Sequence, residues 1–236
     1  MSFSDYLAVT RNRDKVMSVI EFLPLLLQGP TTAIGMTDLA EGLLNASALA
    51  GGYRVVTRCS GLVDMLDPAK IAAMGTVQNP IIRKLGGIEY CFSLGFFPME
   101  HLALLGNRGI IKIDSARFGG IGVFCWFCSL TVHIWRVLYE MLLEYPYVSS
   151  KARDAASIKR NAAFRRKIID LVKTLSWWIF SMTCLPANGK PQLLANPSGL
   201  LLPLHKTVEL LAPNKLVLST SLRGLLGMIA TACDFM

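Results

Sequence analysis

The chain has few charged residues for its length. Of its 236 residues, 17% are charged and 53% are hydrophobic, whereas a typical soluble domain has about 25% charged and about 45–50% apolar residues. The mean hydropathy is +0.45. Large exposed apolar patches are rare on soluble monomers, and a soluble chain of this composition would struggle to avoid them. The composition therefore predicts a membrane protein, and a tightly packed soluble helical domain is the less favoured alternative.

The sequence also lacks the motifs of the common enzyme classes. None of its three histidines, His101, His133 and His205, belongs to a motif that also supplies a nucleophile. There is no Gly-x-Ser-x-Gly, phosphate-binding loop or His-Glu-x-x-His. Cys125-x-x-Cys128 would be half of a zinc site, but no second cysteine pair completes a tetrahedral ligand set. We therefore predict no enzyme activity, no catalytic residues, no cofactor and no metal.

Secretory features are missing as well. The opening Met-Ser-Phe-Ser-Asp lacks the basic and then apolar regions of a signal peptide. The six cysteines are scattered, mostly within apolar stretches, and suggest no disulfide framework. Both observations favour a reducing compartment.

Positive charge is concentrated in one segment. Residues 151–173 carry +6 of the net charge of +8. A basic block beside apolar segments indicates contact with anionic lipid or with a targeting receptor, and nucleic acid fits less well. We predict a basic connector over residues 146–173 with a membrane-targeting cluster inside it, and a solvated loop is the alternative. The predicted cluster comprises Lys159, Arg160, Arg165, Arg166 and Lys167.

Two segments are apolar enough to be predicted as membrane spans. Residues 118–135 are 18 positions without Lys, Arg, Asp or Glu, which reaches the usual threshold for a transmembrane helix. Residues 216–233 form the second candidate. Its one basic residue, Arg223, would cost roughly 2.5–3.5 kcal/mol at the centre of a span, so we expect this helix to pack on a partner. Gly224 and Gly227 would allow close packing there.

The N-terminal part of the chain predicts amphipathic helices. Residues 5–28 form one helix, which Pro24 and the following Gln-Gly-Pro at 28–30 disturb or end. Residues 38–50 form a second short helix, and Gly51-Gly52 acts as a joint after it.

The clearest helical pattern covers residues 53–67, where six apolar side chains fall within about 120° of arc. An apolar stripe beside basic residues is typical of a helix that lies in the membrane interface, although a core-facing helix of a bundle gives the same pattern. Arg54 and Arg58 are the predicted contacts to lipid headgroups. The predicted membrane-inserting face comprises Val55, Val56, Cys59, Leu62, Val63 and Leu66.

These patterns together predict an all-α membrane protein in which N-terminal amphipathic helices are followed by about two transmembrane helices joined by a basic connector. The chain shows no internal repeat and no low-complexity tract. The predicted divisions are an amphipathic helical region at 1–86, a segment with the first span at 87–145, the basic connector at 146–173 and an apolar C-terminal region with the last span at 174–236.

Several short motifs, taken in their order along the chain, resemble those of the peroxin-eleven family. An acidic-histidine pair is followed by Gly-x-x-Gly and a hydrophobic run, just before an apolar segment rich in tryptophan. The opening Arg-Asp-Lys and the glycines of the last predicted span are also similar. The size and the N-terminal run are most like the glycosomal membrane proteins of kinetoplastids. The positions that carry the resemblance are Arg13, Asp14, Lys15, Glu100, His101, Gly106, Gly109, Gly224 and Gly227.

The resemblance implies a multi-pass protein of the peroxisomal (glycosomal) membrane, with both termini in the cytosol, that promotes organelle proliferation. In this family, amphipathic helices insert into the cytosolic leaflet and elongate the membrane before a dynamin-related GTPase divides it. The expected partners are the lipid bilayer, further copies and related family members, the import receptor for peroxisomal membrane proteins and the fission GTPase, but no nucleic acid. A pore for small metabolites and a structural tether without curvature activity remain the alternatives.

Overall fold

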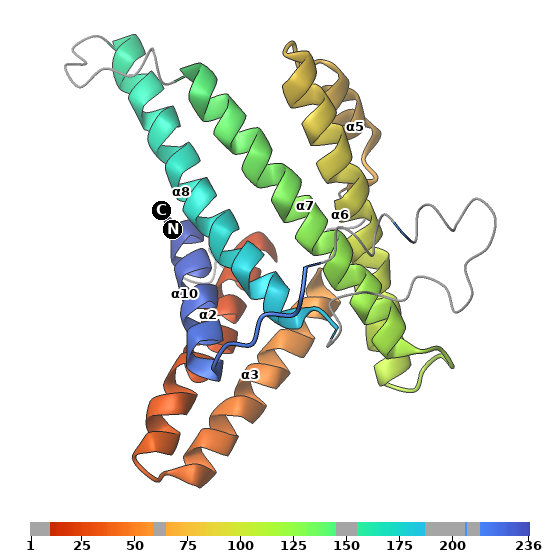
Figure 1. Cartoon of the computed structure of the whole chain (residues 1–236), viewed down its shortest axis with the longest axis vertical. Helices are drawn as coiled ribbons and strands as arrows, with labels where there is room; N and C mark the ends of the chain where they lie inside the picture. The colour runs from red at the N-terminus through yellow and green to blue at the C-terminus, as the bar shows by residue number, and fades with distance from the viewer. Residues whose placement is uncertain (1–9, 59–64, 145–154, 187–205, 207–212) are drawn as a thin grey trace.

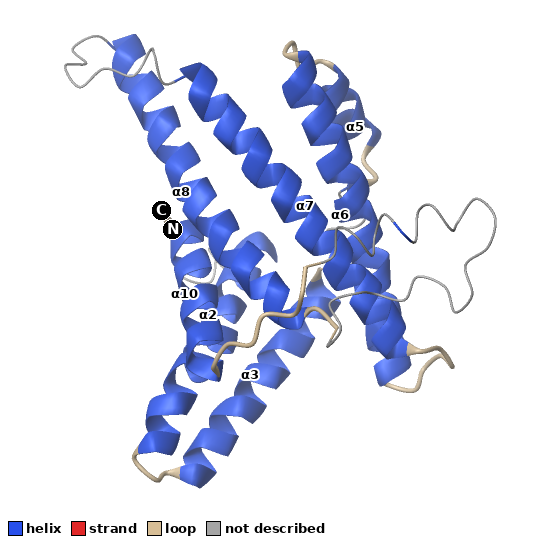
Figure 2. Cartoon of the chain, in the orientation of Figure 1, coloured by secondary structure: helices blue, strands red, loops and turns tan. Residues whose placement is uncertain are grey.

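The computed structural model describes residues 10–58, 65–144, 155–186, 206 and 213–236. Within these ranges all regular secondary structure is helical (Figure 2), which confirms the all-α prediction. The helices are α2 (Thr10–Ala33), α3 (Thr37–Thr57), α5 (Pro68–Gly75), α6 (Pro80–Asn107), α7 (Ser115–Glu144), α8 (Ala155–Cys184) and α10 (Thr220–Phe235).

The helices form two antiparallel hairpins, α2 with α3 and α6 with α7 (Figure 1). Each turn contains a glycine in the left-handed region, Gly35 with φ of 84° and Gly109 with φ of 68°, where a Cβ would be strained. Helix α10 packs along α2, and α8 contacts both α7 and α10. Direct contact between α3 and α6 is sparse, so the main bridge between the hairpins is α8, which reaches the first hairpin through α10.

Capping side chains define the starts of three helices. Asp67 accepts a hydrogen bond from the Ala69 backbone N–H at 2.9 Å, immediately before Pro68 opens α5. Asn79 does the same for α6, and Ser219 for α10. Such side chains satisfy backbone donors that have no partner inside the helix.

The prolines do not end helices as predicted. Helix α2 continues through Pro24 and Pro30 to Ala33, and Pro98 lies inside α6 rather than at its start. Nearby side chains bond the backbone beside Pro30: the Gly29 N–H donates to the Ser221 hydroxyl of α10 at 3.1 Å. Such replacement partners are the reason that proline is tolerated in helices packed against other helices in a membrane.

The predicted joint at Gly51-Gly52 and the separate helix over 53–67 are also corrected. Helix α3 passes through both glycines and ends at Thr57. A Cβ at Gly51 would lie 3.1 Å from Glu21 Oε1, so this glycine serves close approach to α2. Residues 59–64 lie outside the described residues, and Asp67 caps a different helix, α5.

The predicted basic connector is helical over its described part. Helix α8 begins at Ala155 and carries the basic block continuously into the apolar segment that ends at Cys184. Helices α6 and α8 therefore run across the predicted divisions at 86/87 and 173/174. The basic block over residues 155–173 therefore forms the polar first half of a long helix.

Two helices among the described residues are long and apolar enough to cross a membrane. One runs over Ser115–Leu143 and contains the predicted span at 118–135. The other is Asn12–Ala33, not the predicted 216–233. Helix α10 has 16 residues and rises only about 24 Å, less than the roughly 30 Å of a hydrocarbon core. The predicted number of spans is supported, and the identity of the second is corrected.

Many large apolar side chains face outward, while several small polar ones are buried between helices. On α8, Ser176 and Ser181 are buried, whereas Ile158 and Leu175 are exposed. Hydroxyl groups and small residues at helix contacts, with large apolar side chains outside, are typical of helices packed in lipid. In water the same surface would be a set of large exposed apolar patches.

Candidate functional site

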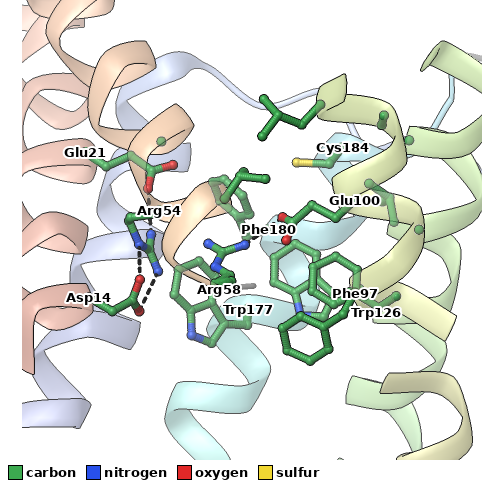
Figure 3. Close-up of a pocket in the computed structure, with 18 of the residues that line it drawn as sticks. Asp14, Glu21, Arg54, Arg58, Phe97, Glu100, Trp126, Trp177, Phe180 and Cys184 are labelled. Carbon is green, nitrogen blue, oxygen red and sulfur yellow. Dashed lines mark hydrogen bonds and ion pairs between the residues drawn. The ribbon is translucent and has the colours of Figure 1, made fainter. Parts of the chain in front are cut away.

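A cleft of about 590 Å³ lies between the two hairpins and is closed on one side by α8. Charged side chains from α2 and α3 line one wall, and aromatic side chains from α6, α7 and α8 line the rest. Figure 3 shows the Arg58 and Glu100 side chains meeting across this cleft, with the rings of Trp126 and Trp177 gathered beside them.

Arg54 is the centre of a buried charge cluster at the base of the first hairpin. Its side chain is 5% exposed and donates to the Asp14 carboxylate at 3.0 Å and to the Glu21 carboxylate at 2.6 Å. Burial disfavours the charge of Arg54, but the bonds to Asp14 and Glu21 outweigh it and raise the arginine pKa. The cluster therefore joins α3 to α2 through a guanidinium that stays charged.

Arg58 links the two hairpins directly. It donates to Glu100 Oε1 at 2.7 Å, and its side chain is 28% exposed. The other carboxylate oxygen, Oε2, is buried and has no hydrogen-bond partner among the described residues. Burial raises the pKa of Glu100, and the nearby Arg58 offsets part of this rise. The adjacent His101 bonds the Phe97 carbonyl through Nδ1.

A second polar cluster, absent from the sequence predictions, ties α8 to the other hairpin. His133 bonds Glu89 on α6 at 2.9 Å and Asp170 on α8 at 2.8 Å. The hydrogen bond with His133 lowers the pKa of Asp170, although burial opposes this. A pattern in the sequence could have revealed this cluster, because three of its polar residues recur on one face of an apolar helix. The members are Glu89, His133, Arg136, Glu140, Lys167 and Asp170.

The structure divides the predicted membrane-inserting residues. Val56 and Leu66 are exposed at 58% and 55%, while Val55 lines the cleft. Cys59, Leu62 and Val63 lie outside the described residues.

The two arginines predicted to contact headgroups are committed to carboxylates instead. Arg54 is buried on two acidic residues of α2, and Arg58 bonds Glu100 across the cleft. Sequence periodicity does not identify partners about 40 residues away along the chain.

The predicted targeting cluster lies on the first half of α8. Lys159, Arg160, Arg165 and Arg166 are exposed there. Lys167 is half-buried and pairs with Glu140 at 3.0 Å.

The motif positions at the two ends of the chain meet in space. Lys15 Nζ donates to the Asp234 carbonyl of α10 at 2.6 Å, and Asp14 holds Arg54. Gly224 and Gly227 lie against α2, at the close packing that their spacing predicted. Arg13 is the first residue of the opening Arg-Asp-Lys motif, and Gly109 lies in the turn between α6 and α7.

A glycine is also required at Gly106, where a Cβ would lie 2.9 Å from Ile113 Cγ1 and 3.1 Å from Ser115 Cβ. This position lets α6 turn tightly into α7. Cys125 and Cys128 are free thiols, and no group of three or more potential metal ligands gathers within the described ranges.

The helical fold, the two candidate spans and the outward apolar side chains define a membrane-associated helical protein. The sequence model of the family "Peroxisomal biogenesis factor 11 (PEX11)" matches residues 1–230, so the chain belongs to the PEX11 family. This confirms the resemblance to the peroxin-eleven family, while the kinetoplastid branch stays a prediction. No curated protein sequence matches the chain, and no solved structure matches it.

Membership of this family indicates a peroxisomal membrane location and a role in peroxisome biogenesis, associated with proliferation and membrane remodelling. The family is one of biogenesis factors and not a known family of enzymes.

Proposed function

We propose that this protein remodels and elongates the peroxisomal membrane by inserting the exposed apolar face of α3 into one leaflet. The proposal rests on the surface of this helix, where apolar side chains are exposed and an arginine is buried. Leu49, Tyr53 and Val56 are exposed at 78%, 44% and 58%, whereas Arg54 between them is 4% exposed. Positions 49, 53 and 56 share one helical face, and among the described residues this face stays exposed.

The energetics suit a reversible wedge. Burying each of these side chains contributes about 1.5 kcal/mol or more, so the face contributes several kcal/mol before ordering costs. An interfacial helix lies about 5–10 Å into the boundary between headgroups and acyl chains, and it therefore expands one leaflet relative to the other. Oligomers with further copies or related family members would concentrate such wedges before the fission machinery acts.

The topology we propose is multi-pass, with both termini on the cytosolic side. The beginning of α2 and the end of α10 lie together (Figure 1), tied by Lys15 and Asp234. Helices α2 and α7 are long and apolar enough to span, and in the remodelling state α2 lies in the interface together with α3, its antiparallel partner. Termini that are close in space lie at the same depth, which supports a common side for both.

We expect the full chain, reconstituted into liposomes, to elongate them, and the double variant Leu49→Glu plus Val56→Glu to reduce elongation at least about fivefold. Two carboxylates remove the apolar face and are costly to bury in acyl chains. Electron microscopy of the vesicles measures the effect. The matched control is Ile110→Glu plus Val217→Glu, because these apolar side chains are exposed outside α3.

Elongation by the Leu49→Glu plus Val56→Glu variant at the level of the unmodified chain would contradict the wedge. Passage of small solutes through these vesicles without elongation would instead favour the pore alternative.

We propose that the exposed basic residues of α8 carry the membrane-targeting signal read by the import receptor. Changing Lys159, Arg160, Arg165 and Arg166 to serine is expected to reduce colocalisation of a tagged chain with a peroxisomal marker from most of the signal to a minor fraction. The loss of four positive charges removes the attraction to acidic or anionic partners. Fluorescence microscopy measures the fraction.

The control for this prediction is Arg83→Ser plus Lys84→Ser, which removes exposed positive charge from the start of α6. Normal targeting of the four-residue α8 variant would show that the cluster is only a solvated helix face.

A further inference from the structure

The cleft between the hairpins has no role in wedge insertion, yet its walls combine aromatic rings with charge. Phe96 of α6 stacks on Trp126 of α7 with ring centroids 5.8 Å apart. Trp126 lies 5.9 Å from Trp177 of α8. Three helices thus contribute one continuous aromatic wall to a cavity of about 590 Å³.

The aromatic cluster already lies against cations. The guanidinium of Arg54 lies over the Phe22 ring at 5.6 Å, and that of Arg223 over the Phe180 ring at 5.5 Å. Aromatic faces attract cations through their quadrupole, most strongly where water is excluded, and quaternary ammonium groups are recognised in this way. The wall formed by Trp126 and Trp177 offers the same chemistry to a ligand in the cleft.

The charges at the cleft favour a zwitterion, and the aromatic wall favours a quaternary ammonium as its cation. Carboxylates outnumber basic side chains along the lining by one, since Lys173 and two arginines face four acids. One oxygen of Glu100 is buried and receives no hydrogen bond from the described part of the chain. The negative charge of this carboxylate adds to the attraction of the rings for such a cation. Arg58 uses Nη1 for Glu100, and a guanidinium has five N–H donors, so it can also hold a phosphate.

We propose that this cleft binds a phosphocholine group, with the quaternary ammonium against Trp126, Trp177 and Glu100 and the phosphate on Arg58. A phosphatidylcholine headgroup and a soluble phosphocholine compound share this chemistry. The cleft lies where α3 and α6 make few other contacts, so the ligand would connect the two hairpins. This binding site goes beyond the proposed remodelling function and does not depend on it.

The test uses the full chain in detergent, with native mass spectrometry after equilibration with phosphatidylcholine, phosphatidylethanolamine or phosphatidylglycerol of identical acyl chains. We expect phosphatidylcholine to be retained about tenfold more than phosphatidylglycerol, a ratio that corresponds to about 1.4 kcal/mol. A desolvated cation–π contact is strong enough to supply this difference. Phosphatidylethanolamine should fall between them. Glu100→Gln and Trp126→Leu should each lower the retention of phosphatidylcholine about fivefold. The control Trp135→Leu changes a tryptophan that is 64% exposed and outside the cleft lining, and it should leave retention unchanged.

Equal retention of the three lipids by the unmodified chain would overturn the proposal. Unchanged phosphatidylcholine retention in both cleft variants would do the same. Glu100→Gln keeps the size of the side chain and an acceptor for Arg58. If Trp126→Leu loses helix by circular dichroism, the retention measured for Glu100→Gln tests the proposal alone. If both variants unfold, the lipid preference of the unmodified chain tests it. Displacement of bound lipid by soluble phosphocholine would identify a free compound as a ligand, and resistance to it would identify the lipid headgroup.

Discussion

Replacing Arg54 with methionine is expected to lower the free energy of unfolding by about 3 kcal/mol. The change preserves side-chain volume but leaves the Asp14 and Glu21 carboxylates without the cation that bonds them at 3.0 and 2.6 Å. An unpaired carboxylate in a partly buried site is costly, and two of them would repel each other. Denaturant or thermal unfolding of the detergent-solubilised chain, followed by far-ultraviolet circular dichroism, measures the loss.

The matched control is Arg83→Met, because Arg83 is exposed at the start of α6. It should change the free energy of unfolding by less than about 0.5 kcal/mol, as surface substitutions usually do. Restoring stability by the triple change of Arg54, Asp14 and Glu21 to apolar residues would further support the cluster as an ion pair. An Arg54→Met chain as stable as the unmodified one would show that the arginine is not held as the structure describes.

Gly224→Ala is expected to destabilise the chain by about 2–3 kcal/mol, the upper part of the range for overpacking. A Cβ at this position would lie 2.7 Å from both the Leu25 carbonyl carbon and the Leu26 Cα. These are backbone atoms of α2, so no side chain can rotate away and α10 must separate from α2. The separation would also weaken the contact between Gly227 and the Phe22 ring. The same unfolding measurement applies.

Gly42→Ala is the control for the glycine prediction. Position 42 lies inside α3 with nothing within 4 Å of an added Cβ, so alanine should be neutral or stabilising by up to about 1 kcal/mol through helix propensity. Equal effects of the two changes would mean that helix propensity, and not interhelical packing, governs both positions.

Local patterns predicted the helices better than they predicted where helices end. Prolines are strong local breakers in water, but Pro24 and Pro30 lie inside α2, where Ser221 of a helix about 190 residues later bonds the backbone N–H of Gly29, next to Pro30. That bond depends on tertiary packing, which a window of sequence does not contain. Gly51 was predicted to be a joint because its local sequence does not show the packing around it. In the structure this glycine permits the approach of Glu21.

In the candidate site, too, local patterns predicted some features, while others depend on tertiary packing. Apolar periodicity identified Val56 as an outward residue and placed Arg54 on the other face of the helix. It could not indicate that this other face packs against the acids of α2, because polar faces normally point to water. In a chain packed within lipid the usual meaning of the two faces is reversed, and the composition alone had already predicted such an environment. The cleft itself requires side chains from α2, α3, α6, α7, α8 and α10 together, so no single segment predicts it.

The bridging role of α8 has a mechanical consequence. Each hairpin is packed internally along its whole length, but the two hairpins share little surface with each other apart from α8 and the Arg58–Glu100 ion pair. Such a molecule is stiff within each hairpin and flexible between the two hairpins. Bending stress in the surrounding bilayer would then be taken up as a change of the angle between the hairpins, and the protein would register the curvature of the membrane in which it lies.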